Sequence, residues 1–189
     1  MRHQLSGPCL SEYFSLSNCI GGMQSLCGHL FGLKFEQVTD RVQAELWDTS
    51  VTKLDIREED GSLAGHIYLD LFARAGKGEG AAHYTIQCGR RWEHAEERQL
   101  PVVALVCSFN SPQPGVPPLL SHYELETLFH EFGHALHSIL SRTDLQHASG
   151  TRVMIDFVET PSTLMENFAW DHRVLKLFAK HYQTGEVCA

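Results

Sequence analysis

The spacing of the hydrophobic residues changes part-way along the chain. Near the start, apolar residues recur at the i, i+3, i+4, i+7 spacing of a helix with one buried face. This spacing predicts a short helix over residues 19–31, whose buried face carries Met23, Leu26, Cys27 and Leu30. Beyond it, apolar and polar residues alternate as they do in half-buried strands. The alternation predicts four strands, at residues 52–56, 63–71, 83–88 and 101–108.

Two short polar segments connect the predicted strands. Glu59–Ser62 has the composition of a turn, so the first two strands should form a hairpin. Gly76–Gly80 is rich in glycine, but it lacks the spacing of a phosphate-binding loop and no helix start follows it. We interpret it as a flexible turn.

A helix over residues 121–140 is the most strongly specified element. Ser121 and Glu124 form the Ser-x-x-Glu pattern of a capping box, and Leu120 and Leu125 occupy the positions of a hydrophobic staple. A single apolar stripe then follows the helix, formed by Leu125, Phe129, Phe132, Leu136 and Ile139. The proline-rich segment 110–118 should be a stiff loop that separates this helix from the strands.

A last helix is predicted after a polar loop at residues 142–154. Proline is tolerated only in the first turn of a helix, so Pro161 places the start near Glu159 or Thr160. One side of this helix should carry Leu164, Phe168, Leu175, Phe178 and Tyr182.

The composition is that of a folded, acidic polypeptide. The 189 residues are 43% hydrophobic, which is enough for a core, and the formal net charge is -8. An acidic chain without a cluster of Lys and Arg argues against nucleic acid as a partner. The longest apolar run, near residues 100–107, is much shorter than the roughly 18 residues of a membrane span.

The helix over 121–140 carries the sequence His-Glu-Phe-Gly-His at residues 130–134. His130 and His134 are four residues apart, so their directions differ by about 40° and both can bind one ion. They lie roughly opposite the apolar stripe, where they should face a cleft. Imidazole nitrogen suits Zn²⁺, and Glu131 lies close enough to reach a water molecule beside the ion.

A catalytic zinc ion takes three protein ligands, so a third must come from another element. Glu159 is the leading candidate because an antiparallel helix pair would return it to the first helix. Glu166, two helical turns further on, is the reserve, and Asp156 is a candidate to support the ligands. Glu126, four residues before His130, could accept the ring N–H of that histidine. Spacing alone leaves the choice of third ligand open.

His137 and the outer contacts of the site are weaker predictions. His137 lies a turn too far along to close a tetrahedron, so we interpret it as a supporting or structural residue. His147 and the backbone around Gly150 are the local candidates for contact with a substrate carbonyl. An extended substrate could also add to an exposed strand, either 63–72 or 101–108.

These motifs resemble one known family. The segments His130–His137, Ser149–Arg152 and Asp156–Ser162 are similar to the thimet-oligopeptidase family of zinc metallopeptidases. Upstream, Glu12–Ser15 and Gly65–Asp70 are similar to the same family. The resemblance therefore covers nearly the whole chain.

The resemblance implies a site and a fold. His130, His134 and Glu159 would bind one Zn²⁺ per chain, and Glu131 would be the general base. The implied fold is α+β and mainly helical, a zincin-like catalytic domain with a small antiparallel sheet before the active-site helices. A deep channel would admit peptides or unfolded precursors and exclude folded proteins.

Family members are several times longer than this chain. We therefore expect residues 1–189 to be part of a single peptidase catalytic domain. Residues 1–120 would be its helix and strand-rich part, and residues 121–189 would hold the zinc-binding helices.

Within the family, the match is closest to members that process imported mitochondrial proteins. The segments that carry it are Ser141–Thr143, Gln146-His147 and Phe178–Gly185. It implies a metalloendopeptidase of the mitochondrial matrix that removes N-terminal octapeptides from precursors, although the first residues lack the pattern of a presequence. A general oligopeptidase of the cytosol or plastid, and an inactive zinc-binding fragment, are the alternatives.

Overall fold

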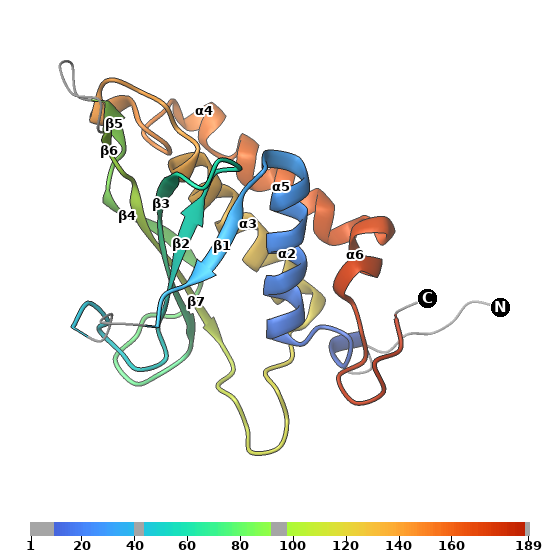
Figure 1. The fold of residues 1–189 in the computed structure, drawn as a ribbon. Coiled ribbons are helices and arrows are strands. Elements are labelled where there is room, and N and C mark those ends of the chain that lie inside the picture. The colour runs from blue at the N-terminus through green and yellow to red at the C-terminus, as the bar shows by residue number, and fades with distance from the viewer. Residues whose placement is uncertain (1–9, 40–43, 92–97, 188–189) are drawn as a thin grey trace.

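The computed structural model describes residues 10–39, 44–91 and 98–187. Its main sheet has five strands in the order β1-β2-β3-β7-β4 (Figure 1). Their bounds are Lys34–Gln37 (β1), Thr52–Arg57 (β2), Leu63–Phe72 (β3), Val102–Phe109 (β7) and Ala82–Gln87 (β4). Two further strands of two residues each form a separate pair, Arg90–Arg91 (β5) and Arg98–Gln99 (β6).

The helices form one core with a single face of this sheet. Strand alternation directs Ile67 and Leu69 of β3 into the core that the helices share, whereas Tyr68 between them faces the opposite side. On that opposite side, Tyr68 packs with Val51 and Ala104 in a much smaller cluster. All helices that position the candidate site therefore lie on one side of the sheet.

The α+β fold class is confirmed, but the description as mainly helical is wrong. The sheet is a major layer of the structure (Figure 1). It is also mixed and not antiparallel, because β3 and β7 pair in parallel while the other neighbours are antiparallel. The segment after β3 forms β4 at the far edge before the chain returns as β7. This crossover brings β3 and β7 together in the same direction.

The predicted hairpin forms, and it also fixes the end of a helix against the sheet. β2 pairs with β3 so that Leu54 faces Ile67. A Cβ at Gly65 of β3 would lie 2.6 Å from Cδ1 of Ile139 and 2.7 Å from the carbonyl oxygen of Pro101. Glycine at this position therefore lets the helix that carries Ile139 approach the sheet closely.

Helix α2 spans Leu16–Phe31, three residues longer at its start than predicted. Met23, Leu26 and Cys27 are buried, whereas Leu30 is exposed. Leu30 lies in the last turn, just before Gly32 adopts a φ of 68° and directs the chain into β1. β1 was not predicted, because its sequence Lys-Phe-Glu-Gln has a single apolar residue and shows no alternation.

Helix α3 spans His122–Ile139 and begins with the predicted capping box. The Ser121 hydroxyl accepts a hydrogen bond from the Glu124 N–H at 3.2 Å, and the Glu124 carboxylate accepts one from the Ser121 N–H at 2.8 Å. The whole predicted apolar stripe is buried: Leu125, Phe129, Phe132, Leu136 and Ile139. The orientation of α3 therefore follows directly from its sequence pattern.

The predicted last helix is divided into three. They are α4 (Ile155–Val158), α5 (Thr160–Trp170) and α6 (His172–Phe178). The second break is at Asp171, whose carboxylate caps α6 by accepting a hydrogen bond from the Arg173 N–H at 2.8 Å. Two residues of the predicted apolar side do not fit it. Leu164 is exposed, and Tyr182 lies beyond the end of α6.

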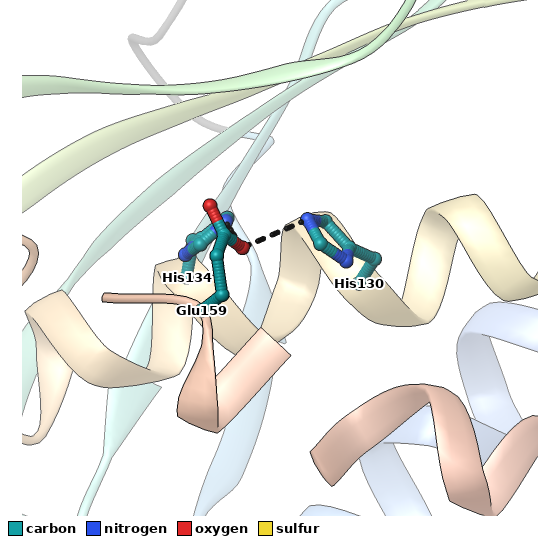
Figure 2. Close-up of side chains that lie close together, drawn as sticks. All are labelled: His130, His134 and Glu159. Atoms are coloured by element: carbon teal, nitrogen blue, oxygen red, sulfur yellow. Dashed lines mark ion pairs between the residues drawn. The ribbon is translucent and has the colours of Figure 1, made fainter. Parts of the chain in front are cut away.

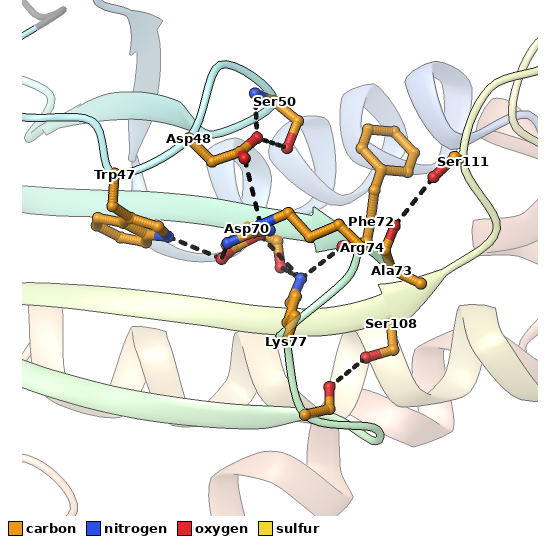
Figure 3. A network of polar contacts seen from close by, with 11 residues as sticks. Trp47, Asp48, Ser50, Asp70, Phe72, Ala73, Arg74, Lys77, Ser108 and Ser111 are labelled. Carbon is orange, nitrogen blue, oxygen red and sulfur yellow. Dashed lines mark hydrogen bonds and ion pairs between the residues drawn. The ribbon is translucent and has the colours of Figure 1, made fainter.

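A buried ion network fixes the segment that we interpreted as a flexible turn (Figure 3). The carboxylate of Asp70 accepts hydrogen bonds from Trp47 at 2.8 Å, Arg74 at 2.5 Å and Lys77 at 2.8 Å. Lys77 also donates to the carbonyl oxygen of Phe72 at 2.8 Å. Burial would raise the pKa of Asp70, but these donors outweigh it and lower the pKa to about 2. The residues around Lys77 are therefore tied to the end of β3.

Candidate metal centre

Three side chains from two separate segments converge at one point (Figure 2). His130 and His134 lie one turn apart on α3, and Glu159 lies at the junction of α4 and α5. Oε2 of Glu159 is 3.1 Å from Nε2 of His134 and 3.4 Å from Nε2 of His130. One donor atom from each residue lies within 4.8 Å of the others.

The convergence depends on a close approach of α3 and α5. A Cβ at Gly133 would lie 2.6 Å from Cα of Ser162 and 2.7 Å from the carbonyl oxygen of Pro161. These are backbone atoms, so a larger residue at Gly133 would force the helices apart. The glycine within the His-Glu-Phe-Gly-His sequence therefore lets α5 bring Glu159 to the histidines, a role that its position between them did not suggest.

The two separations between Glu159 and the histidines fit a tetrahedral zinc ion. Zn–N and Zn–O bonds of about 2.0–2.2 Å at a tetrahedral angle place neighbouring donors roughly 3.4 Å apart. The separations of 3.1 and 3.4 Å from Glu159 to the two rings are close to this value. Two imidazoles and one carboxylate are also a donor set that catalytic zinc sites use.

The hydrogen bond of His130 leaves one ring nitrogen facing the other donors. Nδ1 of His130 lies 2.5 Å from Oε1 of Glu166. A carboxylate only accepts hydrogen bonds, so the ring donates from Nδ1. Nε2 lies 3.4 Å from Oε2 of Glu159 and is the ring nitrogen that could bind a cation.

The second histidine is also suited to ligation. Its side chain is 11% exposed. Burial lowers the pKa of His134, and the nearby His130 and His137 lower it further, whereas Glu159 opposes the shift. A lowered pKa keeps the ring neutral, and a histidine must be neutral to bind a metal through nitrogen.

Glu131 lies beside the convergence point and is 7% exposed. Burial raises the pKa of Glu131, and the negative charge of Glu159 adds to the shift. His130 and a backbone hydrogen bond from His83 act in the opposite direction. A buried carboxylate with a raised pKa is suited to exchanging protons.

The structure corrects one predicted contact, that of Glu126, and places Glu166 beside His130. We had predicted a hydrogen bond between Glu126 and His130. The carboxylate of Glu126 instead accepts a hydrogen bond from Nε1 of Trp170 at 2.8 Å. Glu166 already occupies Nδ1 of the His130 ring. This contact is at Nδ1 and not at Nε2, so Glu166 can orient the ring of His130.

The other predicted residues lie outside the group of three donors. Asp156 is exposed on α4 and makes no hydrogen bond or ion pair within the described ranges. His147 is exposed and contacts Arg152 at 3.2 Å. Gly150 is buried against Ser138 with a φ of 60°, and a Cβ there would lie 2.7 Å from the Ser138 hydroxyl. These three residues are not part of the group of donors.

His83 of β4 is a residue near the site that the sequence did not indicate. Its ring centre is 6.0 Å from that of His134, and its Nε2 lies 3.2 Å from Oγ of Ser138. Burial lowers the pKa of His83 to about 4, with His134 and His137 adding to the shift. An isolated histidine in an alternating strand carries no sequence signal that predicts such a position.

An apolar cavity of about 510 Å³ lies beside the donors. It is bounded by α3, the start of α5 and the loop after α3, and its lining includes Gly133, Leu136, His137, Gly150 and Leu164. His137, which the sequence suggested as a supporting residue, faces this cavity and does not join the three donors.

The chain matches a known family over its full length. The model of the family described as Peptidase family M3 matches residues 1–189. The chain belongs to this family. The resemblance inferred from the motifs is therefore confirmed. The members are metallopeptidases, so the family implies a metal cofactor.

Several curated relatives are named as mitochondrial intermediate peptidases. The protein called "Mitochondrial intermediate peptidase, mitochondrial" of Arabidopsis thaliana is 49% identical over 177 residues, which cover 94% of this chain and 25% of that protein. Proteins called "Mitochondrial intermediate peptidase" are 43% identical in Candida glabrata and 40% identical in Yarrowia lipolytica. These matches cover 94% and 93% of this chain, but only 26% and 25% of the relatives. The chain thus spans about a quarter of their length.

Within the described ranges, no helix combines the length and the apolar character needed to cross a membrane.

Proposed function

We propose that this chain carries the metal-binding and catalytic residues of a zinc-dependent metalloendopeptidase. His130, His134 and Glu159 would bind one Zn²⁺, and Glu131 would be the general base. The convergence of the three donors carries this proposal, with Glu159 at tetrahedral separations from both histidines. Membership of a metallopeptidase family supports it.

The neighbouring residues have defined parts in peptide hydrolysis. A zinc ion held by three such donors polarises a carbonyl group and acidifies water. The carboxylate of Glu131 takes the proton of the attacking water and returns it to the leaving amine nitrogen, for which its raised pKa suits it. Glu166 holds the proton on Nδ1 of His130 and so keeps Nε2 free as a donor atom.

The substrate would lie between β4 and α5. Ser138 and Glu131 of α3 approach His83 of β4, whereas Gly133 approaches α5, so the histidines lie between these two elements. β4 is at the edge of the sheet, where an extended peptide can add as a further strand. The strands that we predicted for this role, 63–72 and 101–108, are both central, so that prediction is wrong.

The apolar cavity beside the donors gives a further reason to expect a peptide substrate. Its lining of Leu136, Leu164 and neighbouring apolar groups would take an apolar side chain. Gly150 lines the same cavity, so the contact between this residue and the substrate would be with a side chain and not with a carbonyl oxygen.

The names of the relatives suggest the class of substrate. We propose that the longer protein to which residues 1–189 correspond acts on imported precursor proteins in the mitochondrial matrix and removes N-terminal octapeptides. The names of the relatives, at up to 49% identity, support a mitochondrial peptidase, and the octapeptide is what the resemblance to the family implies. The whole chain would be part of one catalytic domain, with the strand-rich residues 1–120 and the helices of 121–189 packed together.

A quenched fluorescent peptide based on a mitochondrial precursor, tested with the purified chain, distinguishes the alternatives. We expect cleavage that a chelator abolishes and added zinc restores, at a single bond near the N-terminus. Cleavage of many unrelated short peptides would favour a general oligopeptidase. Zinc binding without any cleavage would favour a metal-binding fragment and would contradict the proposed activity of this chain.

A further inference from the structure

Glu159 is the least constrained of the three donors. His130 and His134 project from the middle of α3, and their side chains are 27% and 11% exposed. Glu159 lies at a helix junction, and its side chain is 57% exposed. A long, exposed acidic side chain loses much rotamer freedom when it is fixed in one geometry. A group that fixes it beforehand would therefore strengthen metal binding.

Ser162 provides such a contact. Its Oγ lies 2.7 Å from Oε2 of Glu159 and 2.9 Å from the carbonyl oxygen of the same residue. Both partners are acceptors and the hydroxyl has one hydrogen, which it donates to the carboxylate or shares between the two oxygens. Oε2 is also the oxygen that lies nearest to His134 and His130. The hydroxyl therefore holds the same atom that faces the candidate metal position.

The position of this hydroxyl is itself fixed by helix packing. Ser162 is 0% exposed in the first turn of α5. Its backbone packs against Gly133 of α3, where there is no room for a Cβ. A buried group that makes close backbone contact with a neighbouring helix has little freedom to move. The contact between α3 and α5 thus determines where Oε2 of Glu159 lies relative to the histidines.

We propose that Ser162 is a positioning residue that orients Glu159 for zinc binding without touching the ion. The proposal rests on the proposed function in one respect, the assignment of Glu159 as a ligand. Loss of a residue that orients a metal ligand typically weakens metal binding about 10–100-fold. We expect a loss of that size in Ser162→Ala.

The test measures zinc affinity by competition with a chromogenic chelator, for the wild type, Ser162→Ala, Glu159→Ala and a control. Ser15→Ala is the matched control, because Ser15 is 4% exposed and its side chain makes no capping bond at the start of α2. We expect weaker binding in Ser162→Ala and unchanged binding in Ser15→Ala. The visible spectrum of the cobalt-loaded protein should also change in Ser162→Ala only, because it reports the geometry of the ligands.

The remaining outcomes separate this proposal from the proposed function. If Glu159→Ala loses zinc while Ser162→Ala binds it within twofold of wild type, the positioning role is wrong and the ligand assignment stands. If the wild type binds no zinc, or Glu159→Ala binds it normally, both are wrong. Should Ser162→Ala not fold, Ser162→Cys replaces it, because a thiol of similar size is only a weak donor. Zinc binding by Ser162→Cys within twofold of wild type would then show that the positioning role is wrong.

Discussion

The carboxylate of Glu131 differs from an ordinary surface acid in its surroundings. It is buried beside the three donors, and burial together with the charge of Glu159 raises its pKa. An acid whose pKa is shifted toward the working pH can both accept and return a proton. Its carboxylate accepts a hydrogen bond from the backbone of His83.

We predict that Glu131→Gln removes peptide hydrolysis and leaves zinc binding intact. The amide has nearly the same shape but cannot take a proton from water, so kcat/KM should fall by about 10²–10⁴. Parallel measurements of zinc content and of peptide cleavage check this. Glu79→Gln, in an exposed turn, is the control and should be fully active. Unchanged cleavage by Glu131→Gln would remove this residue from its role.

Two glutamates near His130 should respond differently to the same substitution. Glu166 bonds Nδ1 of His130 at 2.5 Å, whereas Glu126 bonds Trp170. We expect Glu166→Gln to weaken zinc affinity by roughly 10–100-fold, because it removes the carboxylate that orients the ring. Glu126→Gln should bind zinc as the wild type does. Competition with a chelator measures both, and equal affinities would show that Glu166 has no orienting role.

Sequence spacing predicts part of this site and not the rest. The relation between His130 and His134 is local, since one helical turn fixes it. The choice between Glu159 and Glu166 depends on how α5 crosses α3, and both residues lie on the same side of the predicted helix. Only the close approach at Gly133 places Glu159 at Nε2 and Glu166 at Nδ1 of His130.

At the scale of elements, the contact between α3 and α5 positions the site. Gly133 and Ser162 meet where a Cβ would be 2.6 Å from backbone. A shift of either helix would move the histidines or Glu159. The packing of α3 against α5 therefore determines the geometry of the three donors.

We predict that Gly133→Ala destabilises the fold and weakens zinc binding together. Overpacking of this kind costs about 1–3 kcal/mol of unfolding free energy. Gly21→Ala in α2 is a matched control, because its Cβ would meet nothing within 4 Å. That change should stabilise the protein by up to about 1 kcal/mol. Urea unfolding and zinc titration of both variants check the prediction, and normal zinc affinity in Gly133→Ala would contradict it.

The elements that the sequence predicts well are those with local signals. The start of α3 is marked by Ser121 and Glu124, and its orientation follows from five apolar residues at helical spacing. The parallel pairing of β3 with β7 could not be predicted, because it is decided by contacts between distant segments. The break at Asp171 is a similar case: its capping signal is short, and the apolar pattern continues across it.

At the scale of the whole molecule, one buried acid links the sheet to the segment that follows β3. Asp70 is 3% exposed and is held by Trp47, Arg74 and Lys77 (Figure 3). Its pKa is lowered to about 2, so the folded state favours the charged form. A lowered pKa contributes stability above the ordinary pKa of the group, and that stability is lost as pH falls toward the folded value.

We therefore predict an acid-dependent loss of stability from Asp70. Between pH 4 and pH 2 the lost contribution should be about 2 kcal/mol, from a shift of nearly two pKa units. Asp70→Asn should be less stable than wild type near pH 6 and should lose less stability across this range. Urea unfolding at several pH values measures both. An equal loss of unfolding free energy with falling pH in the two proteins would contradict this prediction.

The central claim is that α3 and the α4–α5 junction together bind one zinc ion. Metal analysis of the purified chain after exposure to zinc and dialysis, beside Glu159→Ala, tests it most directly. We predict one zinc per chain in the wild type and a sharp loss in Glu159→Ala. Equal zinc content in the two proteins, or no zinc in either, would contradict the account.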